Sequence, residues 1–187
     1  KLGKNDVVND KIYEFFRDEF FNEFNHIHCP SKFIANQLKL HGYTAKLHVI
    51  SNGIESDFKY TKLPKPDNLK DKFVITMIGR YSEEKRQDLL IDAVSKSKYK
   101  EKIQLVFAGR GPKERCYTRL GKKLVNRPIF KFFNKDDLKN LLSFTDLYVH
   151  TADAEIEAIS CIEAFAMGLV PVIANSDKSA TTQFALD

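Results

Sequence analysis

The sequence predicts an α/β fold: a Rossmann-like parallel sheet with helices on both faces, preceded by the tail of a second Rossmann-like domain. After residue 72, short uninterrupted apolar runs alternate with stretches of helical periodicity, the pattern of βαβ units whose strands are buried on both faces. Before residue 59 a shorter version of this alternation occurs. Hydrophobic residues make up 43% and charged residues 29% of the 187, which excludes a disordered tail, a collagen-like repeat and a disulfide scaffold.

Residues 1–58 are interpreted as the C-terminal remnant of one domain. Ser31 stands just before an amphipathic stretch, and its hydroxyl can accept a bond from a free N–H of a first helical turn, so we expect it to be an N-cap. The elements predicted in order are an aromatic-rich helix over 9–24, a strand over 26–29, a helix from Ser31 to about Leu40 and a strand over 47–50.

Residues 59–72 are predicted to be a linker, because they hold two prolines and many lysines but no apolar period. Residues 73–187 are interpreted as a second domain, truncated at its C-terminus. A chain that begins at Lys1 and stops at Asp187 without a closing element is expected to be a piece of a longer protein. The predicted strands cover 73–78, 103–108, 129–132, 147–150 and 170–174, and the predicted helices cover 87–98, 112–124, 135–143 and 158–167.

Charge is concentrated in one segment. The net charge is +5, and residues 96–139 carry 14 positive and 4 negative charges. Such a segment is either a solvated face or a contact for an anionic partner such as membrane lipid. No zinc-finger spacing or ribonucleoprotein signature is present, so no nucleic-acid partner is predicted. We hypothesise a peripheral contact with anionic membrane lipid.

Cysteine usage and hydropathy indicate the compartment. Cys29, Cys116 and Cys161 are odd in number and lack Cys-x-x-Cys spacing, which is typical of reduced thiols and predicts a cytoplasmic protein. No signal peptide or membrane-spanning stretch is visible. His26 and His28 alternate on a strand without a third ligand, so we interpret them as packing residues and predict no metal site.

Loops that follow the strands of a parallel sheet meet at one edge, where ligands bind. Gly79 permits a tight turn there, and Arg80 and Lys85 can converge on an anion; the alternative is a surface ion pair with Glu83 or Glu84. The turn Gly109-Arg110-Gly111-Pro112 lacks the third glycine of a dinucleotide fingerprint, so a tight turn is the simpler interpretation.

Glu163 interrupts an otherwise apolar helical stretch that also contains Ser160. A carboxylate in such a place costs free energy unless it has a partner, and the two hydroxyls of a ribose would suit it; the alternatives are a structural salt bridge or simple exposure. Glu155 lies eight residues earlier, in the loop that leads to this helix. His150 ends a strand at the same edge and is a candidate ligand contact. Ser160 is placed with the substrate-binding residues.

Taken in order, these motifs resemble the GT-B fold retaining glycosyltransferases of group 1 (family 4). The matching stretches are Ile78–Lys85, Leu105–Pro112, Glu155–Gly168 and Val170–Ala174. Upstream, Pro30–Phe33 and Val49–Ile54 resemble the passage from the N-terminal to the C-terminal domain of that family. Arg80–Lys85 together with Ser179–Asp187 resembles bacterial capsular polysaccharide biosynthesis transferases.

The resemblance implies a role for each candidate residue. The second domain would be the nucleotide-sugar-binding donor domain. In it, Arg80 and Lys85 would hold the donor diphosphate, Glu163 the ribose hydroxyls and Glu155 the transferred sugar, while Gly109–Gly111 and the backbone near Phe133 and Asn134 would flank the base. Gly79 is a further substrate-binding candidate. Two fixed cations and a helix N-terminus stabilise a departing diphosphate, so no metal or other cofactor is expected.

The resemblance further implies transfer of a hexosyl or related sugar from a nucleotide-diphosphate donor to a glycan or lipid-linked acceptor, with retention, in bacterial capsule or surface polysaccharide biosynthesis. Two departures stand out: Ile156-Glu157-Ala158 occupies positions where the family usually has glycines and an aromatic, and Arg86 replaces a common glycine. The alternatives are a sugar-nucleotide epimerase of the same architecture and a catalytically silent nucleotide-binding module. The chain alone is expected to bind a donor but not to transfer its sugar.

Overall fold

The computed structural model describes residues 6–185, so Leu186 and Asp187, which the sequence assigns to the second domain, lie outside the described residues. The chain divides into two compact units, Lys1–Asn52 and Gly53–Asp187. The predicted linker 59–72 lies within the second unit. Phe58 and Leu69 are buried in its core clusters, and a short 3₁₀ helix forms over Asp67–Leu69.

The first unit begins with a helix that is not continuous, contrary to the prediction over 9–24. Helix α1 (Asp6–Phe15) passes into a π-helical segment (Phe16–Phe20) and a 3₁₀ turn (Phe21–Glu23). Phenylalanines recur here at a spacing of five residues, from 15 to 20 and from 16 to 21. A π turn, whose bonds join residues five apart, suits that spacing better than an α turn. At this π turn the Phe16 ring contacts the rings of both Phe20 and Phe21, with centroids 6.3 and 6.5 Å apart.

The rest of the first unit is a small βαβ element. Strands β1 (His26–Cys29) and β2 (Lys46–Val49) pair in parallel, and helix α2 (Lys32–Leu40) connects them. The Ser31 hydroxyl accepts from the Ile34 N–H at 3.2 Å, which confirms the predicted N-cap. Ile27, Cys29 and Ala35 form its core.

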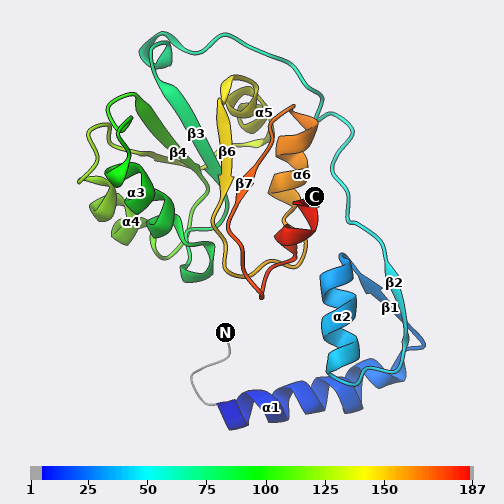
Figure 1. Cartoon of the computed structure of the whole chain (residues 1–187). Coiled ribbons are helices and arrows are strands. Elements are labelled where there is room, and N and C mark those ends of the chain that lie inside the picture. The colour runs from blue at the N-terminus through cyan, green and yellow to red at the C-terminus, as the bar shows by residue number, and fades with distance from the viewer. Residues whose placement is uncertain (1–5, 186–187) are drawn as a thin grey trace. The chain divides into compact units, whose positions relative to one another are not determined.

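The second unit contains a five-stranded parallel sheet in the order β5-β4-β3-β6-β7 (Figure 1). The strands, in chain order, are β3 (Phe73–Ile78), β4 (Ile103–Ala108), β5 (Ile129–Lys131), β6 (Leu147–His150) and β7 (Val172–Ile173). The chain winds outward from β3 in both directions, so the predicted Rossmann-like arrangement is confirmed.

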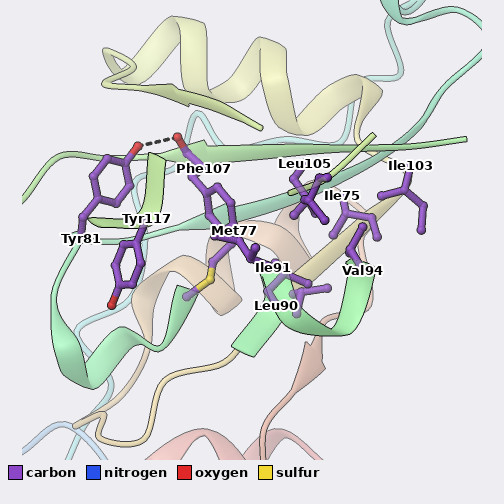
Figure 2. Close-up of a cluster of buried hydrophobic side chains, with 12 residues drawn as sticks. Ile75, Met77, Tyr81, Leu90, Ile91, Val94, Ile103, Leu105, Phe107 and Tyr117 are labelled. Carbon is purple, nitrogen blue, oxygen red and sulfur yellow. Dashed lines mark hydrogen bonds between the residues drawn. The ribbon is translucent and has the colours of Figure 1, made fainter. Parts of the chain in front are cut away.

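Helices cover both faces of this sheet, as expected for strands that are apolar on both sides. Helices α3 (Gln87–Lys96) and α4 (Glu114–Gly121) pack on one face, against Ile75, Met77 and Leu105 (Figure 2). Helices α5 (Lys135–Phe144) and α6 (Ile159–Ala166) pack on the other face, against residues that alternate with the first set, such as Val74 and Tyr148. The core is therefore two apolar layers separated by the sheet.

Some predicted strands and helices are longer than the observed ones. The strand predicted over 170–174 is reduced to Val172–Ile173, because Pro171 has no N–H to donate to a neighbouring strand. The helix predicted over 112–124 covers only Glu114–Gly121, and the helix predicted over 158–167 begins after Ala158, whose backbone is left-handed. Over residues 6–185 no helix combines the length and the apolar character needed to cross a bilayer.

Candidate functional site

The predicted site residues gather at the carboxyl edge of the second unit's sheet, where the loops after β3, β4 and β6 meet. The loop after β3 packs directly on the loop after β4. A Cβ at Gly109 would lie 2.0 Å from the Gly79 carbonyl oxygen, and one at Gly111 would lie 2.5 Å from the Tyr81 carbonyl oxygen. This close approach explains why glycine stands at 109 and 111; a contact of either with a donor stays a prediction.

Lys85 and Glu155 meet at the centre of this edge. The Lys85 ammonium donates to Glu155 Oε1, and His150 Nε2 lies 2.8 Å from the same oxygen. The side chains of Lys85 and Glu155 are 19% and 11% exposed. The sequence predicted that all three residues line the edge, and the structure brings them into one hydrogen-bonded cluster.

The same contacts set the charge of Glu155. Burial would raise the pKa of its carboxyl, but the hydrogen bonds from His150 and Lys85 outweigh burial and leave the pKa below its ordinary value. Glu155 is therefore an ionised carboxylate that balances the Lys85 cation.

His150 reaches this cluster from inside the fold. Its side chain is only 1% exposed, because β6 places it beneath Glu155; its contact with a ligand stays a prediction. Its Nδ1 lies 3.4 Å from the Tyr148 hydroxyl, and Ser160 interacts with that same hydroxyl. Ser160 and His150 are thus both neighbours of the Tyr148 hydroxyl, and a contact of Ser160 with a donor stays a prediction.

Arg80 differs from Lys85 in forming no ion pair in the described part of the chain, although its charge helps to lower the pKa of Glu84. Its side chain is exposed, and none of the ion pairs found in the described part of the chain involves it. The alternative of a surface pair with Glu83 or Glu84 is therefore not what the structure shows. The Arg80 carbonyl is fixed by the Gln87 amide at 2.9 Å, so the guanidinium extends from an anchored backbone.

Glu163 is a half-buried carboxylate on α6. Burial and the nearby Glu55 both raise the pKa of its carboxyl. No hydrogen bond or ion pair to the Glu163 carboxylate is found within residues 6–185, so the structural salt bridge that was the alternative does not form there. A partly desolvated carboxylate without a hydrogen-bond donor can accept hydrogen bonds from the hydroxyls of a ligand.

A hollow of about 300 Å³ lies beside these residues, between the loops that follow β3, β4 and β5. Its lining includes Gly79, Arg80, Gly109 and Phe133. The side-chain oxygen of Asn134, the next residue, accepts from the Asp137 N–H at 2.8 Å and caps α5; a contact of its backbone with a donor stays a prediction.

Two residues with side chains adopt left-handed backbone conformations, Arg86 (φ 55°) and Ala158 (φ 63°). Among residues 6–185 they are the two non-glycine positions with positive φ. Both are positions where the sequence departs from the glycines of the family it resembles. The fold thus keeps the glycine-type conformation although glycine is gone, at a cost of about 1 kcal/mol for each residue.

A further set of contacts, which the sequence analysis did not predict, joins the loop after β3 to the loop after β6. The Arg86 guanidinium pairs with Asp153 at 3.1 Å and with Asp88 at 3.2 Å. The Thr151 hydroxyl donates to the carbonyls of Lys85 and Arg86, and the Asp153 N–H donates to the Glu84 carbonyl at 2.8 Å. A signal was present only in the unusual Arg86 itself.

No group of three or more histidine, cysteine, aspartate or glutamate side chains in the described residues is arranged to hold a metal ion. His26 Nδ1 and His48 Nε2 are 2.8 Å apart and form a hydrogen-bonded pair in the first unit. This pairing accounts for His26 without a metal, and His28 lies 2.6 Å from the Ile50 carbonyl oxygen.

Comparison with known proteins adds to this geometry. Residues 59–185 match the family model described as glycosyl transferases group 1. An uncharacterized glycosyltransferase of Bacillus subtilis (strain 168), YqgM, is 29% identical over 136 residues, which cover 70% of this chain. The chain spans only 37% of the length of that curated relative.

Solved structures are also similar. The catalytic domain of cholesterol-alpha-glucosyltransferase from Helicobacter pylori is 52% identical, with a TM-score of 0.59, over 62% of this chain and 72% of that one. Anabaena HepE in complex with UDP and glucose has a TM-score of 0.78 at 22% identity, over 93% of this chain and 50% of that one. The second likeness shows the fold.

Proposed function

Since the chain belongs to the glycosyl transferases of group 1, as its motifs predicted, we propose that its second unit binds a nucleotide-diphosphate sugar and that the protein transfers this sugar with retention. One arrangement carries the proposal: an exposed Arg80 outside the ion pairs of the described residues and a Lys85–Glu155 pair lie at the carboxyl edge of one parallel sheet, and the helix that follows Glu155 carries the half-buried Glu163. A nucleotide-sugar offers a matching diphosphate, sugar and ribose.

Each group of the donor finds a complementary residue. Arg80 and Lys85 would hold the diphosphate, and their charge would stabilise it as it departs. The ribose hydroxyls would donate to Glu163, the sugar would lie against Glu155, and the base would enter the hollow beside Phe133. Binding the diphosphate requires Lys85 to turn away from Glu155, so the ion pair of the free protein is exchanged for one with the donor.

The proposal includes no metal cofactor, because Arg80 and Lys85 supply the positive charge that a metal would otherwise supply. Sugar transfer by the protein is therefore expected to continue in the presence of a strong chelator such as EDTA. A loss of transfer that added Mg²⁺ or Mn²⁺ restores would overturn this part of the proposal.

We infer that the donor is a UDP-hexose, with UDP-glucose the first candidate. HepE is described in complex with UDP and glucose, and the relative at 52% identity is named as a glucosyltransferase. That name also specifies an alpha product. Because nucleotide-diphosphate glucose is itself the α anomer, an α product means retention. The anomeric configuration of the product, determined by NMR, tests this inference.

For the acceptor, a lipid is favoured over a glycan. The resemblance to capsular transferases suggests a glycan or lipid-linked acceptor in surface polysaccharide biosynthesis. The higher identity, however, is to a relative named for cholesterol. We therefore propose a lipid hydroxyl, with cholesterol as the first acceptor to test. Assays with radiolabelled donor should yield an organic-soluble product; a product confined to a polysaccharide fraction would favour the capsular role.

A lipid acceptor calls for contact with a membrane from the cytoplasmic side. The support is the basic segment, in which Arg115, Arg119 and Lys122 line an exposed face of α4. Anionic vesicles at low salt should retain the protein, and neutral vesicles should not. If both kinds of vesicle fail to retain it, the proposal of a peripheral membrane protein is wrong.

Nucleotide binding tests the donor site, and sugar transfer separates the transferase from a silent nucleotide-binding module. Calorimetry with UDP, GDP and ADP should detect binding of one nucleotide, and Glu163→Ala should weaken it about tenfold, because the ribose loses a charged acceptor. Absence of binding at millimolar nucleotide would refute both the transferase and the epimerase. Binding that Glu163→Ala does not change would refute the ribose assignment. A sugar-nucleotide epimerase would instead convert the donor without any acceptor.

A further inference from the structure

The side chain of His150 is almost completely buried and bonds to a proposed sugar-binding carboxylate, with 2.8 Å between its Nε2 and Glu155 Oε1. We propose that His150 is a positioning residue that fixes the Glu155 carboxylate for the donor sugar. This inference rests on the proposed function, which places Glu155 against that sugar. His150 itself touches no part of the donor.

The contacts of His150 determine which ring nitrogen carries the proton. Nε2 faces an ionised carboxylate oxygen, which can only accept, so Nε2 donates. Nδ1 faces the Tyr148 hydroxyl at 3.4 Å, and this hydroxyl can donate to it. His150 therefore has polar partners on both sides of its ring.

Tyr148, His150 and Glu155 all stand on backbone that the fold holds in place. Tyr148 and His150 both belong to β6, the strand next to the centre of the sheet. The backbone of Glu155 is also held, because its carbonyl accepts from the Ala180 N–H at 2.9 Å. Only the direction of the Glu155 side chain is left to be set, and His150 and Lys85 set it.

Lys85 and His150, the two hydrogen-bond partners of Glu155, are expected to behave differently when a donor binds. Lys85 is proposed to turn to the diphosphate, which removes its bond to Glu155. The bond from His150 then remains as the one that directs the carboxylate. Because His150 and Lys85 both use Oε1, a sugar hydroxyl would reach Oε2. We therefore expect the contribution of His150 to appear in the complex with the complete donor.

Comparison of UDP with UDP-glucose isolates this effect, because UDP lacks the sugar that Glu155 would contact. In the unmodified protein and in each variant, calorimetry measures both dissociation constants. We expect His150→Leu to weaken UDP-glucose binding about tenfold more than UDP binding, since a hydrogen bond to a charged group is lost. His150→Gln, whose amide N–H can replace Nε2–H, should restore most of the difference.

Two further variants protect the test against a simple loss of folding. Tyr148→Phe keeps the ring but removes the donor to Nδ1, and it should cause a smaller change in the same direction. Thr145→Val removes another buried hydrogen bond, the 2.7 Å contact with Thr76, and should leave the ratio of the two constants unchanged.

The outcomes separate the inference from the proposed function. If the unmodified protein binds neither ligand, the proposed function fails. If it binds both and the ratio is the same in His150→Leu and Tyr148→Phe, the positioning role is refuted. Equal weakening of UDP and UDP-glucose in His150→Leu would also refute it, because that is the signature of a structural role alone.

Discussion

At the scale of single residues, Arg86 combines a strained backbone with an ion pair that joins two loops. Its left-handed φ of 55° is unfavourable for a residue with a Cβ, whereas its guanidinium pairs with Asp153 across two loops. Half-exposed pairs of this kind stabilise a fold by at most about 1 kcal/mol. The strain and the pair are therefore of similar size and opposite sign.

This balance predicts that Arg86→Gly changes the free energy of unfolding by less than about 1 kcal/mol. A double-mutant cycle with Asp153→Asn separates the two contributions. Asp153→Asn should destabilise the unmodified protein slightly and should have no effect once Arg86 is glycine. Chemical denaturation measures all four proteins. An equal effect of Asp153→Asn in both backgrounds would mean that the pair contributes nothing.

Glu163 allows a prediction of pH dependence. Burial and Glu55 raise the pKa of its carboxyl above the ordinary value of 4.5, so as pH falls Glu163 takes up a proton before an exposed glutamate would. Protonation removes the charge that is proposed to accept from the ribose. Affinity for UDP-glucose should therefore rise with pH through this raised pKa and then level off.

The control for this prediction is Glu163→Gln, which cannot ionise. It should bind more weakly at neutral pH and show a flatter pH profile between about pH 4 and pH 7. UDP-glucose is the suitable ligand because its diphosphate, esterified at both ends, does not titrate in this range. If the profiles of the two proteins run parallel, Glu163 does not contact the donor.

At the scale of elements, the loops after β3 and β4 depend on each other. Gly109→Ala would place a Cβ 2.0 Å from the Gly79 carbonyl oxygen, so the two loops would have to separate. We expect a loss of about 2–4 kcal/mol in the free energy of unfolding, together with weaker nucleotide binding. Thermal or chemical denaturation and calorimetry measure the two effects.

The matched control is Gly53→Ala. Gly53 also has a positive φ, of 70°, but nothing lies within 4 Å of its added Cβ. It should therefore cost only the conformational term, about 1 kcal/mol. Similar losses at Gly53 and Gly109 would show that the close approach of the two loops is not what requires glycine at 109.

Elements were predictable where a local pattern decides them. The strands β3 and β4 are continuous apolar runs and agree with prediction over their whole length, and Ser31 caps α2 as its side chain suggests. The fragmented helix after Phe15 was missed, because its π turn depends on how neighbouring phenylalanines pack. Sequence periodicity alone does not report such packing.

The candidate site likewise has parts that local sequence patterns predict and parts that depend on packing. That Arg80, Lys85 and Glu155 share one edge follows from strand order, which the alternation of strands and helices predicts. The burial of His150 and the ion pair between Arg86 and Asp153 depend on side-chain direction and on contacts between distant loops. Neither follows from the residues close to them in the sequence.

At the scale of the whole chain, the second unit carries its own core. The three clusters of buried side chains that surround the sheet are drawn entirely from residues after Gly53. Two of them lie on opposite faces of the same sheet, so together they bury both sides of its central strands. A core of this kind should not need residues 1–52 in order to form.

We therefore predict that residues 53–187 fold as an independent domain and bind the donor nucleotide. Unfolding followed by circular dichroism should be a single cooperative transition, since domains of this size usually unfold in one step. Because Arg80, Lys85, Glu155 and Glu163 all lie in this unit, UDP should raise its melting temperature by mass action. Glu163→Ala in the same domain should reduce that rise. A domain that unfolds without cooperativity, or one that folds but is not stabilised by UDP or by any other nucleotide, would contradict the prediction.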